Sequence, residues 1–218
     1  MQIDEYIAAH SSPEDEYLHR LWRETNQCVV RPHMVSGHVE GLLLAMLVEM
    51  VKPRNVLEIG TFTGYSAIAM SYALPPGGRI YTFDINDELE DFTRGRIAGS
   101  RRGADIVYTV GDALQKAPAM ARNLGLSFDM VFIDGNKRQY VDYYKMARSL
   151  LSKGGYILAD NTLWDGHVID SAYDRDSQTR GIREFNDFVA ADEGVSKVVV
   201  PVRDGLTIIK ALDDNDNR

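Results

Sequence analysis

The sequence predicts an α/β fold in which helices cover both faces of a doubly wound, mostly parallel β-sheet. Three observations lead to this prediction. Short apolar runs alternate with amphipathic stretches, a pattern typical of strand–helix–strand units. A glycine-rich segment joins the first strand to the following helix. Only Arg203-Asp204-Gly205 separates the last two strands, and Asp-Gly favours a hairpin, so we expect that pair to be antiparallel.

The strands and helices follow from hydrophobic periodicity. Five parallel strands are expected at Asn55–Ile59, Arg79–Asp84, Ile106–Val110, Phe128–Ile133 and Tyr156–Asp160, and the hairpin strands at Lys197–Val202 and Leu206–Lys210. Helical patterns lie at Tyr65–Ala73, Asp87–Ser100, Asp112–Leu124, Lys137–Leu151 and Thr179–Ala191. Three further helices, Asp4–Ala9, Pro13–Gln27 and Gly37–Met50, precede the sheet. We therefore expect one domain over 1–218, with a helical extension at 1–50, a core at 51–212 and a polar tail at 213–218.

Composition excludes several classes of protein. The 218 residues carry 24 basic and 32 acidic side chains, a net charge of −8, which argues against nucleic acid as a partner. The single cysteine, Cys28, cannot form an internal disulfide and is expected to be a small buried hydrophobe. The start of the chain lacks a signal-peptide pattern, and the longest apolar run, Gly41–Val48, is too short to span a bilayer. A cytoplasmic protein without a membrane partner is predicted.

The glycine-rich turn predicts a nucleoside site. Gly60 and Gly64 follow the first strand, but Phe62 stands where the dinucleotide-binding motif needs its second glycine. Asp84 ends the second strand, where a carboxylate can accept both ribose hydroxyls. After the third strand, Asp112 is expected to cap the next helix, and the short Ala113 could let an adenine ring approach. The alternative is a tight strand–helix turn with no ligand.

A second set of polar residues follows the fourth and fifth strands. Asp134, Asp160 and Asn161 should converge at the carboxyl edge of the sheet, and such hard oxygen ligands suit Mg²⁺, Mn²⁺ or Ca²⁺. Lys137 begins a helix over the same edge, where a partly desolvated lysine can act as a base. The alternative interpretation is that the acids and the amide cap helices and that Lys137 is solvated.

Several of these segments together resemble one family. VLEIGTFTGYSA, YTFDIND, GDAL, FDMVFIDGNKRQYVDYY and GGYILADNTLWDGHV are similar to the cation-dependent class I O-methyltransferases, the relatives of caffeoyl-CoA and catechol O-methyltransferases. The resemblance covers about Pro32 to Lys210. It implies a Rossmann-like sheet of seven strands ending in an antiparallel hairpin, S-adenosylmethionine as cofactor and a homodimer.

The resemblance also implies roles for individual residues. The cofactor pocket would be lined by Val35, Glu58, Gly60, Thr61, Ser66, Asp84, Ala113 and Asp134. The metal would be held by Asp134, Asp160 and Asn161, and Lys137 would match the catalytic lysine, beside Asp134. On the acceptor side, Asp165 and Asn136 match substrate-contacting positions, and Trp164 could wall the pocket. Asn136 departs from the family pattern, because an acid usually stands there.

The activity expected from the resemblance is methyl transfer from S-adenosylmethionine to a hydroxyl of a catechol-type or related phenolic small molecule, assisted by Mg²⁺. Three alternatives stay open at this point. They are a metal-independent small-molecule methyltransferase, an NAD-dependent oxidoreductase, which Phe62 disfavours, and a non-catalytic nucleoside-binding protein. The segment from Asp170 to Thr179 is expected to be either part of an acceptor lid or a surface loop.

Overall fold

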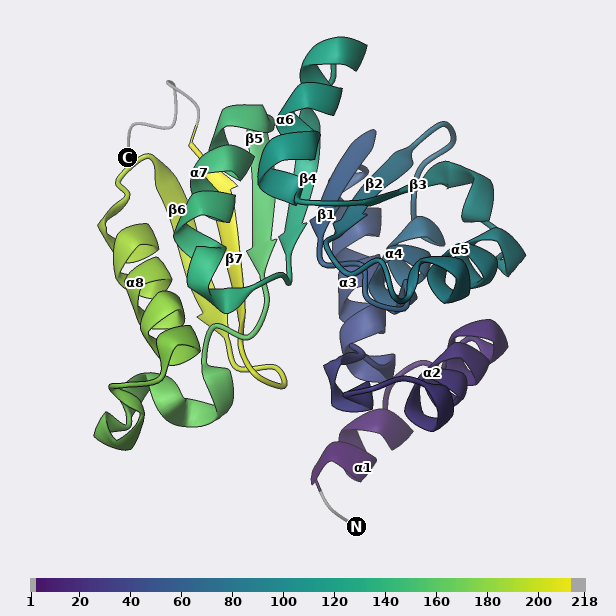
Figure 1. The fold of residues 1–218 in the computed structure, drawn as a ribbon, viewed down its shortest axis with the longest axis horizontal. Helices are drawn as coiled ribbons and strands as arrows, with labels where there is room; N and C mark the ends of the chain where they lie inside the picture. The colour runs from purple at the N-terminus through teal and green to yellow at the C-terminus, as the bar shows by residue number, and fades with distance from the viewer. Residues whose placement is uncertain (1–2, 213–218) are drawn as a thin grey trace.

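The computed structural model describes residues 3–212, which form a seven-stranded sheet in the order β3-β2-β1-β4-β5-β7-β6 (Figure 1). The five strands β1 to β5 pair parallel to their neighbours, and β7 runs antiparallel to both β5 and β6. The predicted sheet, mostly parallel with a C-terminal hairpin, is confirmed. The strands are β1 Asn55–Ile59, β2 Arg79–Asp84, β3 Ile106–Val110, β4 Phe128–Ile133, β5 Leu151–Ala159, β6 Val195–Val200 and β7 Leu206–Ala211.

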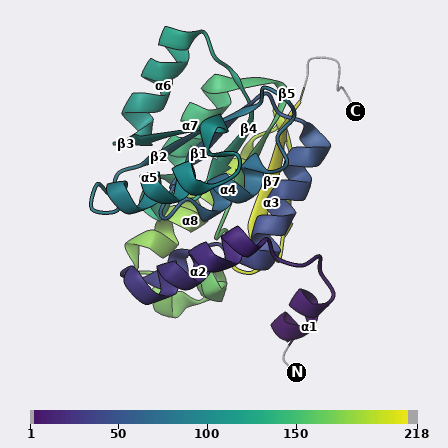
Figure 2. The same ribbon diagram turned by 90° about the vertical axis from the view of Figure 1, so that its right-hand side faces the viewer.

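Helices lie on both faces of this sheet (Figure 1, Figure 2). The first face is covered by α3 His38–Val51, α4 Tyr65–Ser71 and α5 Glu90–Gly99, and the second by α6 Ala113–Leu124, α7 Tyr140–Leu150 and α8 Ser177–Ala191. Two N-terminal helices, α1 Ile3–Ala9 and α2 Glu16–Cys28, precede them. Five short 3₁₀ helices complete the described elements: η1 Pro32–Met34, η2 Gly103–Asp105, η3 Lys137–Gln139, η4 Trp164–Ile169 and η5 Ser171–Tyr173.

The strands β1 to β5 and β7 contribute to two hydrophobic cores, one on each face of the sheet. In β4, Met130 and Phe132 pack with α3 and α4, whereas Val131 and Ile133 pack with α7 and α8. All four side chains are fully buried. A strand that is buried on both faces has a continuous apolar sequence. The run FDMVFI is of this kind, which is why the predicted bounds of β4 are correct.

The fifth strand differs most from its predicted bounds. It begins at Leu151 instead of Tyr156, because Leu151 already pairs with Phe128 before an irregularity in the ladder between Phe128 and Met130. Gly154 and Gly155 lie within the strand, although glycine pairs usually mark a turn. The prediction that Cys28 is buried is also wrong, since this residue ends α2 with an exposed side chain.

One helical stretch, Pro32–Val51, is long and apolar enough to cross a membrane by length and composition alone, with a mean hydropathy of 1.5. In the structure it packs on the sheet, with Leu44 and Val48 fully buried. The first turn of α3 also carries Glu40, which is buried and paired with Arg203 of the turn between β6 and β7. This stretch is therefore a core helix with one exposed apolar side, on which Met46 and Met50 lie.

Candidate active site

The carboxyl ends of β1, β2, β4 and β5 meet at one edge of the sheet, where most of the predicted site residues lie. The Asp134 backbone N–H donates to Ile59 across 2.8 Å, and that of Asp160 donates to Ile133 across 3.0 Å. The parallel pairing thus continues one residue past β4 and β5, and it holds the two aspartates side by side at the ends of these neighbouring strands.

The turn after β1 passes so close to β4 that only glycine fits. Gly60 has φ +100°, and a Cβ there would lie 2.2 Å from the backbone oxygen of Asp134. Phe62, at φ 49°, donates its N–H to the Asp84 carboxylate at 2.6 Å, and Asn86 donates to the other oxygen at 2.9 Å. Asp84 is therefore fixed beside the turn, as a ribose-binding carboxylate requires.

Glu58 lies beneath the same turn and is fully buried. Its oxygens accept hydrogen bonds from Ser66 at 2.6 Å and from Thr82 at 2.5 Å, and Thr61 contacts Thr82 at 2.6 Å. Burial raises the pKa of Glu58 to about 8, against the lowering effect of these two hydroxyls. The structure thus places the Glu58 carboxylate behind the turn, where it ties α4 to β2.

Val35 and Ala113 belong to the hydrophobic cores on the two different faces of the sheet. Val35 is buried directly after η1, before α3, and its carbonyl accepts from the Arg203 guanidinium at 3.4 Å. Ala113 is buried as the first residue of α6. Asp112 caps that helix by accepting the Leu114 N–H at 2.9 Å, which confirms its predicted capping role.

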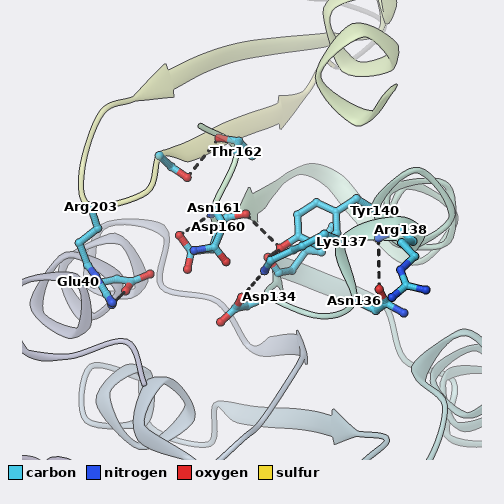
Figure 3. A network of polar contacts seen from close by, with 12 residues as sticks. Glu40, Asp134, Asn136, Lys137, Arg138, Tyr140, Asp160, Asn161, Thr162 and Arg203 are labelled. Atoms are coloured by element: carbon cyan, nitrogen blue, oxygen red, sulfur yellow. Dashed lines mark hydrogen bonds and ion pairs between the residues drawn. The ribbon is translucent and has the colours of Figure 1, made fainter. Parts of the chain in front are cut away.

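The carboxylates of Asp134 and Asp160 lie together with Asn161 (Figure 3). Asp160 is buried and accepts the Asn161 backbone N–H at 2.7 Å. Burial raises the pKa of Asp160 well above its ordinary range, and the charges of Asp134 and Glu40 raise it further. Among residues 3–212 no three His, Cys, Asp or Glu side chains form a metal-binding group, so a cation here needs the amide oxygen of Asn161 as its third protein ligand.

Lys137 is buried beside Asp134, where two partners fix its ammonium group. Nζ donates to Asp134 Oδ1 at 2.8 Å and to the Tyr140 hydroxyl at 2.7 Å. Tyr140 is fully buried and donates in turn to the Asp160 backbone oxygen at 3.0 Å. Sequence reasoning missed Tyr140, although its position three residues after Lys137 places both on one helical face.

The predicted acceptor-side residues do not all gather at this edge. The Trp164 ring lies 5.8 Å from Lys137 Nζ, which places an aromatic wall beside the lysine. Asp165 is exposed at φ 50°, and its backbone N–H donates to the Asp204 carboxylate in the β6–β7 turn. Asn136 is exposed and its side chain caps η3 through the Arg138 N–H at 3.3 Å, away from the carboxylates (Figure 3).

A single arginine ties down the segment from 165 to 176. Arg183 of α8 donates to the backbone oxygens of Val168, His167 and Asp170 at 2.7 to 2.9 Å. It also pairs with Asp174 at 2.6 Å. We call this segment, residues 165–176, the flap; it follows Trp164 and is held in place by Arg183. The sequence of the segment itself did not predict these contacts.

Comparisons with known proteins show the family and the fold. The model of a family described as O-methyltransferase matches residues 8–212. The caffeoyl-CoA O-methyltransferase of Petroselinum crispum is 35% identical over 189 residues, covering 82% of this chain and 77% of that protein. Among solved structures, an O-methyltransferase from Bacillus cereus in complex with SAH is 28% identical with a TM-score of 0.88, covering 96% of this chain and 97% of that one. TomG from Streptomyces achromogenes, involved in tomaymycin synthesis and solved with SAM, is 29% identical with a TM-score of 0.87, covering 97% and 96%.

Proposed function

The chain belongs to the class I S-adenosylmethionine-dependent O-methyltransferases, and from that premise we propose that a divalent cation assists it and that its acceptor is a catechol-type or related phenolic small molecule. Membership in this family overturns two alternatives, the NAD-dependent oxidoreductase and the non-catalytic nucleoside-binding protein. A metal-independent small-molecule methyltransferase is the remaining alternative.

The observation that carries the proposal is the cluster of Asp134, Asp160 and Asn161 beside the cofactor turn. Two neighbouring carboxylates, one of them buried, repel each other, and Lys137 pairs with one of them, Asp134, at 2.8 Å. Two carboxylates and one amide suit a hard cation such as Mg²⁺, with Mn²⁺ and Ca²⁺ as alternatives. The residues present therefore fit a divalent ion, which when bound would lower the pKa of an acceptor hydroxyl and orient it.

The proposed acceptor follows from the other wall of the site. The Trp164 ring offers an aromatic surface near Lys137, and two adjacent hydroxyls of a catechol could fill the open positions of a cation held by three protein ligands. The name of the Petroselinum relative points to a caffeoyl acceptor, which carries such a pair of hydroxyls.

Lys137 is proposed as the base. A neutral amine has two N–H groups, and the contacts to Asp134 and Tyr140 use both, which leaves the lone pair for the acceptor proton. The acceptor oxygen then forms a bond to the methyl carbon as the sulfonium–carbon bond breaks, leaving a thioether. The contacts to Asp134 and to the fully buried Tyr140 fix Nζ, so that positioning contributes to the rate.

On the cofactor side, Asp84 is proposed to accept the ribose hydroxyls, with Ala113 beside the adenine and Val35, Gly60, Thr61, Ser66 and Asp134 lining the pocket. The role of Asp84 is supported by its fixed orientation, since backbone N–H groups donate to both of its carboxylate oxygens. Glu58 would act by holding Ser66 and Thr82 in place, since its carboxylate has no exposed surface. Asp165 and Asn136 stay predictions as acceptor contacts.

An acceptor panel tests the proposed function. The purified protein is incubated with S-adenosylmethionine, Mg²⁺ and one of catechol, guaiacol or phenol, and methylated product is measured by mass spectrometry. We expect catechol to react about 100-fold faster than the two monohydroxy compounds, because only catechol can chelate and be oriented. Equal rates for all three would contradict a catechol-type acceptor.

We also propose a homodimer that uses the exposed side of α3. Met46 and Met50 are 60% and 73% exposed, and a groove of about 560 Å³ beside them is lined by Leu47, Met130, Leu158 and Ile208 among others. Exposed apolar surface of this kind marks interaction sites. A cytoplasmic location, and the absence of nucleic-acid and membrane partners, stay predictions.

A further inference from the structure

Glu40 lies at the edge of the carboxylate cluster, although neither the glycine turn nor the strand ends pointed to it. It is on α3 and is 2% exposed. Its Oε2 pairs with the guanidinium of Arg203, which lies in the turn between β6 and β7 (Figure 3). Glu40 therefore joins the helix that follows the cofactor segment to the hairpin that borders the acceptor side.

The second oxygen of Glu40 has no such contact. Among the described residues, Oε1 is buried without a hydrogen-bond partner. Leaving a buried carboxylate oxygen unsatisfied costs free energy, so an ion pair that served only to hold α3 to the hairpin would be expected to satisfy both oxygens. The free oxygen indicates that a further group belongs beside it.

The Glu40 carboxylate, which carries this oxygen, faces the proposed cation site. The Glu40 carboxylate points toward that of Asp160 (Figure 3), and the two side chains lie within hydrogen-bonding reach of each other. Asp134 is close enough for its charge to act on both. Two facing carboxyl groups are held together either by a proton that they share or by a cation with its hydration shell, which can displace that proton.

We propose that Glu40 is a positioning residue of the cation site, whose Oε1 accepts a hydrogen bond from the hydration shell of a divalent ion held by Asp134, Asp160 and Asn161. Contact with the hydration shell is favoured over direct ligation, because no three carboxylates in residues 3–212 form a metal-binding group and Mg²⁺ keeps several of its waters. Arg203 would fix the carboxylate in this orientation. This inference rests on the proposed cation dependence.

The test is a titration of the full-length protein with MgCl₂ by isothermal calorimetry, in the presence of saturating S-adenosylhomocysteine. Outer-sphere partners of a metal change its affinity by about 10- to 100-fold. We therefore expect Glu40→Gln to weaken Mg²⁺ binding by at least about tenfold. Glu90→Gln is the matched control, since it removes the same charge from an exposed i,i+4 pair with Arg94, and we expect its Mg²⁺ affinity to equal that of the wild type.

The affinity for S-adenosylhomocysteine in excess chelator distinguishes a role of Glu40 at the cation site from a purely structural role in holding α3 to the hairpin. We expect Glu40→Gln to bind S-adenosylhomocysteine as tightly as the wild type there, because the proposed contact exists only with the cation present. An equal loss of cofactor and Mg²⁺ affinity would overturn the inference in favour of a purely structural ion pair. If Glu40→Gln does not fold, Glu40→Asp retracts the carboxylate by one methylene and keeps its charge, and wild-type Mg²⁺ affinity in that variant would equally overturn it.

The outcomes for the two proposals differ. Absence of Mg²⁺ binding to the wild type, with Mn²⁺ and Ca²⁺ also failing, would overturn the cation dependence and this inference with it. Wild-type Mg²⁺ binding that Glu40→Gln leaves unchanged would overturn this inference alone.

Discussion

At the scale of single residues, Lys137 carries the chemistry of the proposed site. We expect Lys137→Ala to lower kcat/KM by about 10²- to 10⁴-fold, because the acceptor proton loses its base. The rate is measured by initial velocities of methyl transfer to catechol. We expect the S-adenosylmethionine affinity to change little, since the side-chain contacts of Lys137 go to Asp134 and Tyr140 and not to Asp84, the proposed ribose-binding carboxylate.

Arg138→Ala is the matched control for that substitution. Arg138 is the next residue along the chain, is exposed and carries the same charge. Its loss should leave kcat/KM within about twofold of the wild type. Undiminished turnover by Lys137→Ala would contradict the assignment of the base.

Glu58 makes the stability of the protein depend on pH. Its folded-state pKa of about 8 lies above the ordinary value of 4.5, so the folded state binds the proton more tightly than the unfolded state does. The stability from this group is complete below the ordinary pKa and is lost as the pH rises through about 8. We therefore expect Tm to fall as the pH rises from about 5 to about 9.

Glu58→Gln should flatten this fall in Tm, because glutamine has no proton to lose. Thermal denaturation followed by circular dichroism across the pH range measures the difference. Glu184→Gln, at an exposed position of α8, serves as control and should retain the wild-type slope. A slope that is the same in all three proteins would refute the role of Glu58.

At the scale of elements, the flap from 165 to 176 depends on Arg183. Removing its hydrogen bonds to three carbonyls and to Asp174 should loosen the segment, since bonds from a charged donor contribute about 2 kcal/mol each. We expect Arg183→Ala to lower amide-exchange protection in the flap by at least about tenfold and to raise the KM for catechol. Arg175→Ala, an exposed arginine of the flap itself, should leave both unchanged.

The elements also show how far the sequence alone determines this fold. β1 to β4 have their predicted bounds. β1, β2 and β4 are buried on both faces, and such strands are continuous apolar runs with polar ends, whereas β3 lies at the edge of the sheet and is only partly buried. β5 begins five residues earlier than predicted, since pairing with Phe128 outweighs the local turn signal of Gly154 and Gly155. Tertiary pairing of this kind has no local signature.

The candidate site likewise contains some residues that the local sequence predicted and others that it did not. Asp134, Asp160, Lys137 and Asp84 were predictable because strand ends and short spacings place them. Glu40 and Arg203 join the site through a contact between α3 and the β6–β7 turn, which are distant in the sequence. Tyr140 lies three residues from Lys137, but its hydrogen bond to the Asp160 backbone depends on the packing of α7 against β5. Asn136, taken from the family pattern, lies apart from the carboxylates because its side chain caps η3 instead.

At the scale of the whole molecule, the net charge of −8 is not spread evenly. Glu58, Asp160 and Glu40 are buried in one region, where burial raises the pKa of each carboxyl. The 32 acidic residues whose excess argued against a nucleic-acid partner thus include a small buried set at the carboxyl edge of the sheet. The positive groups proposed for this edge, a sulfonium cofactor and a divalent cation, would favour the ionised forms of these carboxyls.

The proposed dimer is the other property of the whole molecule. Met50→Glu places a charge in the exposed apolar side of α3, where Met50 is 73% exposed. We expect the wild type to elute as a dimer and Met50→Glu as a monomer in size-exclusion chromatography with light scattering, because burying an unpaired charge in an interface is unfavourable. Glu49→Gln is a control on the same helix and should remain dimeric. A monomeric wild type would contradict the proposed interface.

The most direct test of cation-assisted O-methylation is the initial rate of methyl transfer from S-adenosylmethionine to catechol, measured after dialysis against a chelator and again after adding Mg²⁺. The predicted result is loss of nearly all activity on chelation and its recovery with Mg²⁺, because the cation would orient the acceptor hydroxyl and favour its ionisation. Asp160→Ala should abolish the recovery. An unchanged rate in excess chelator would contradict the proposal and favour the metal-independent alternative.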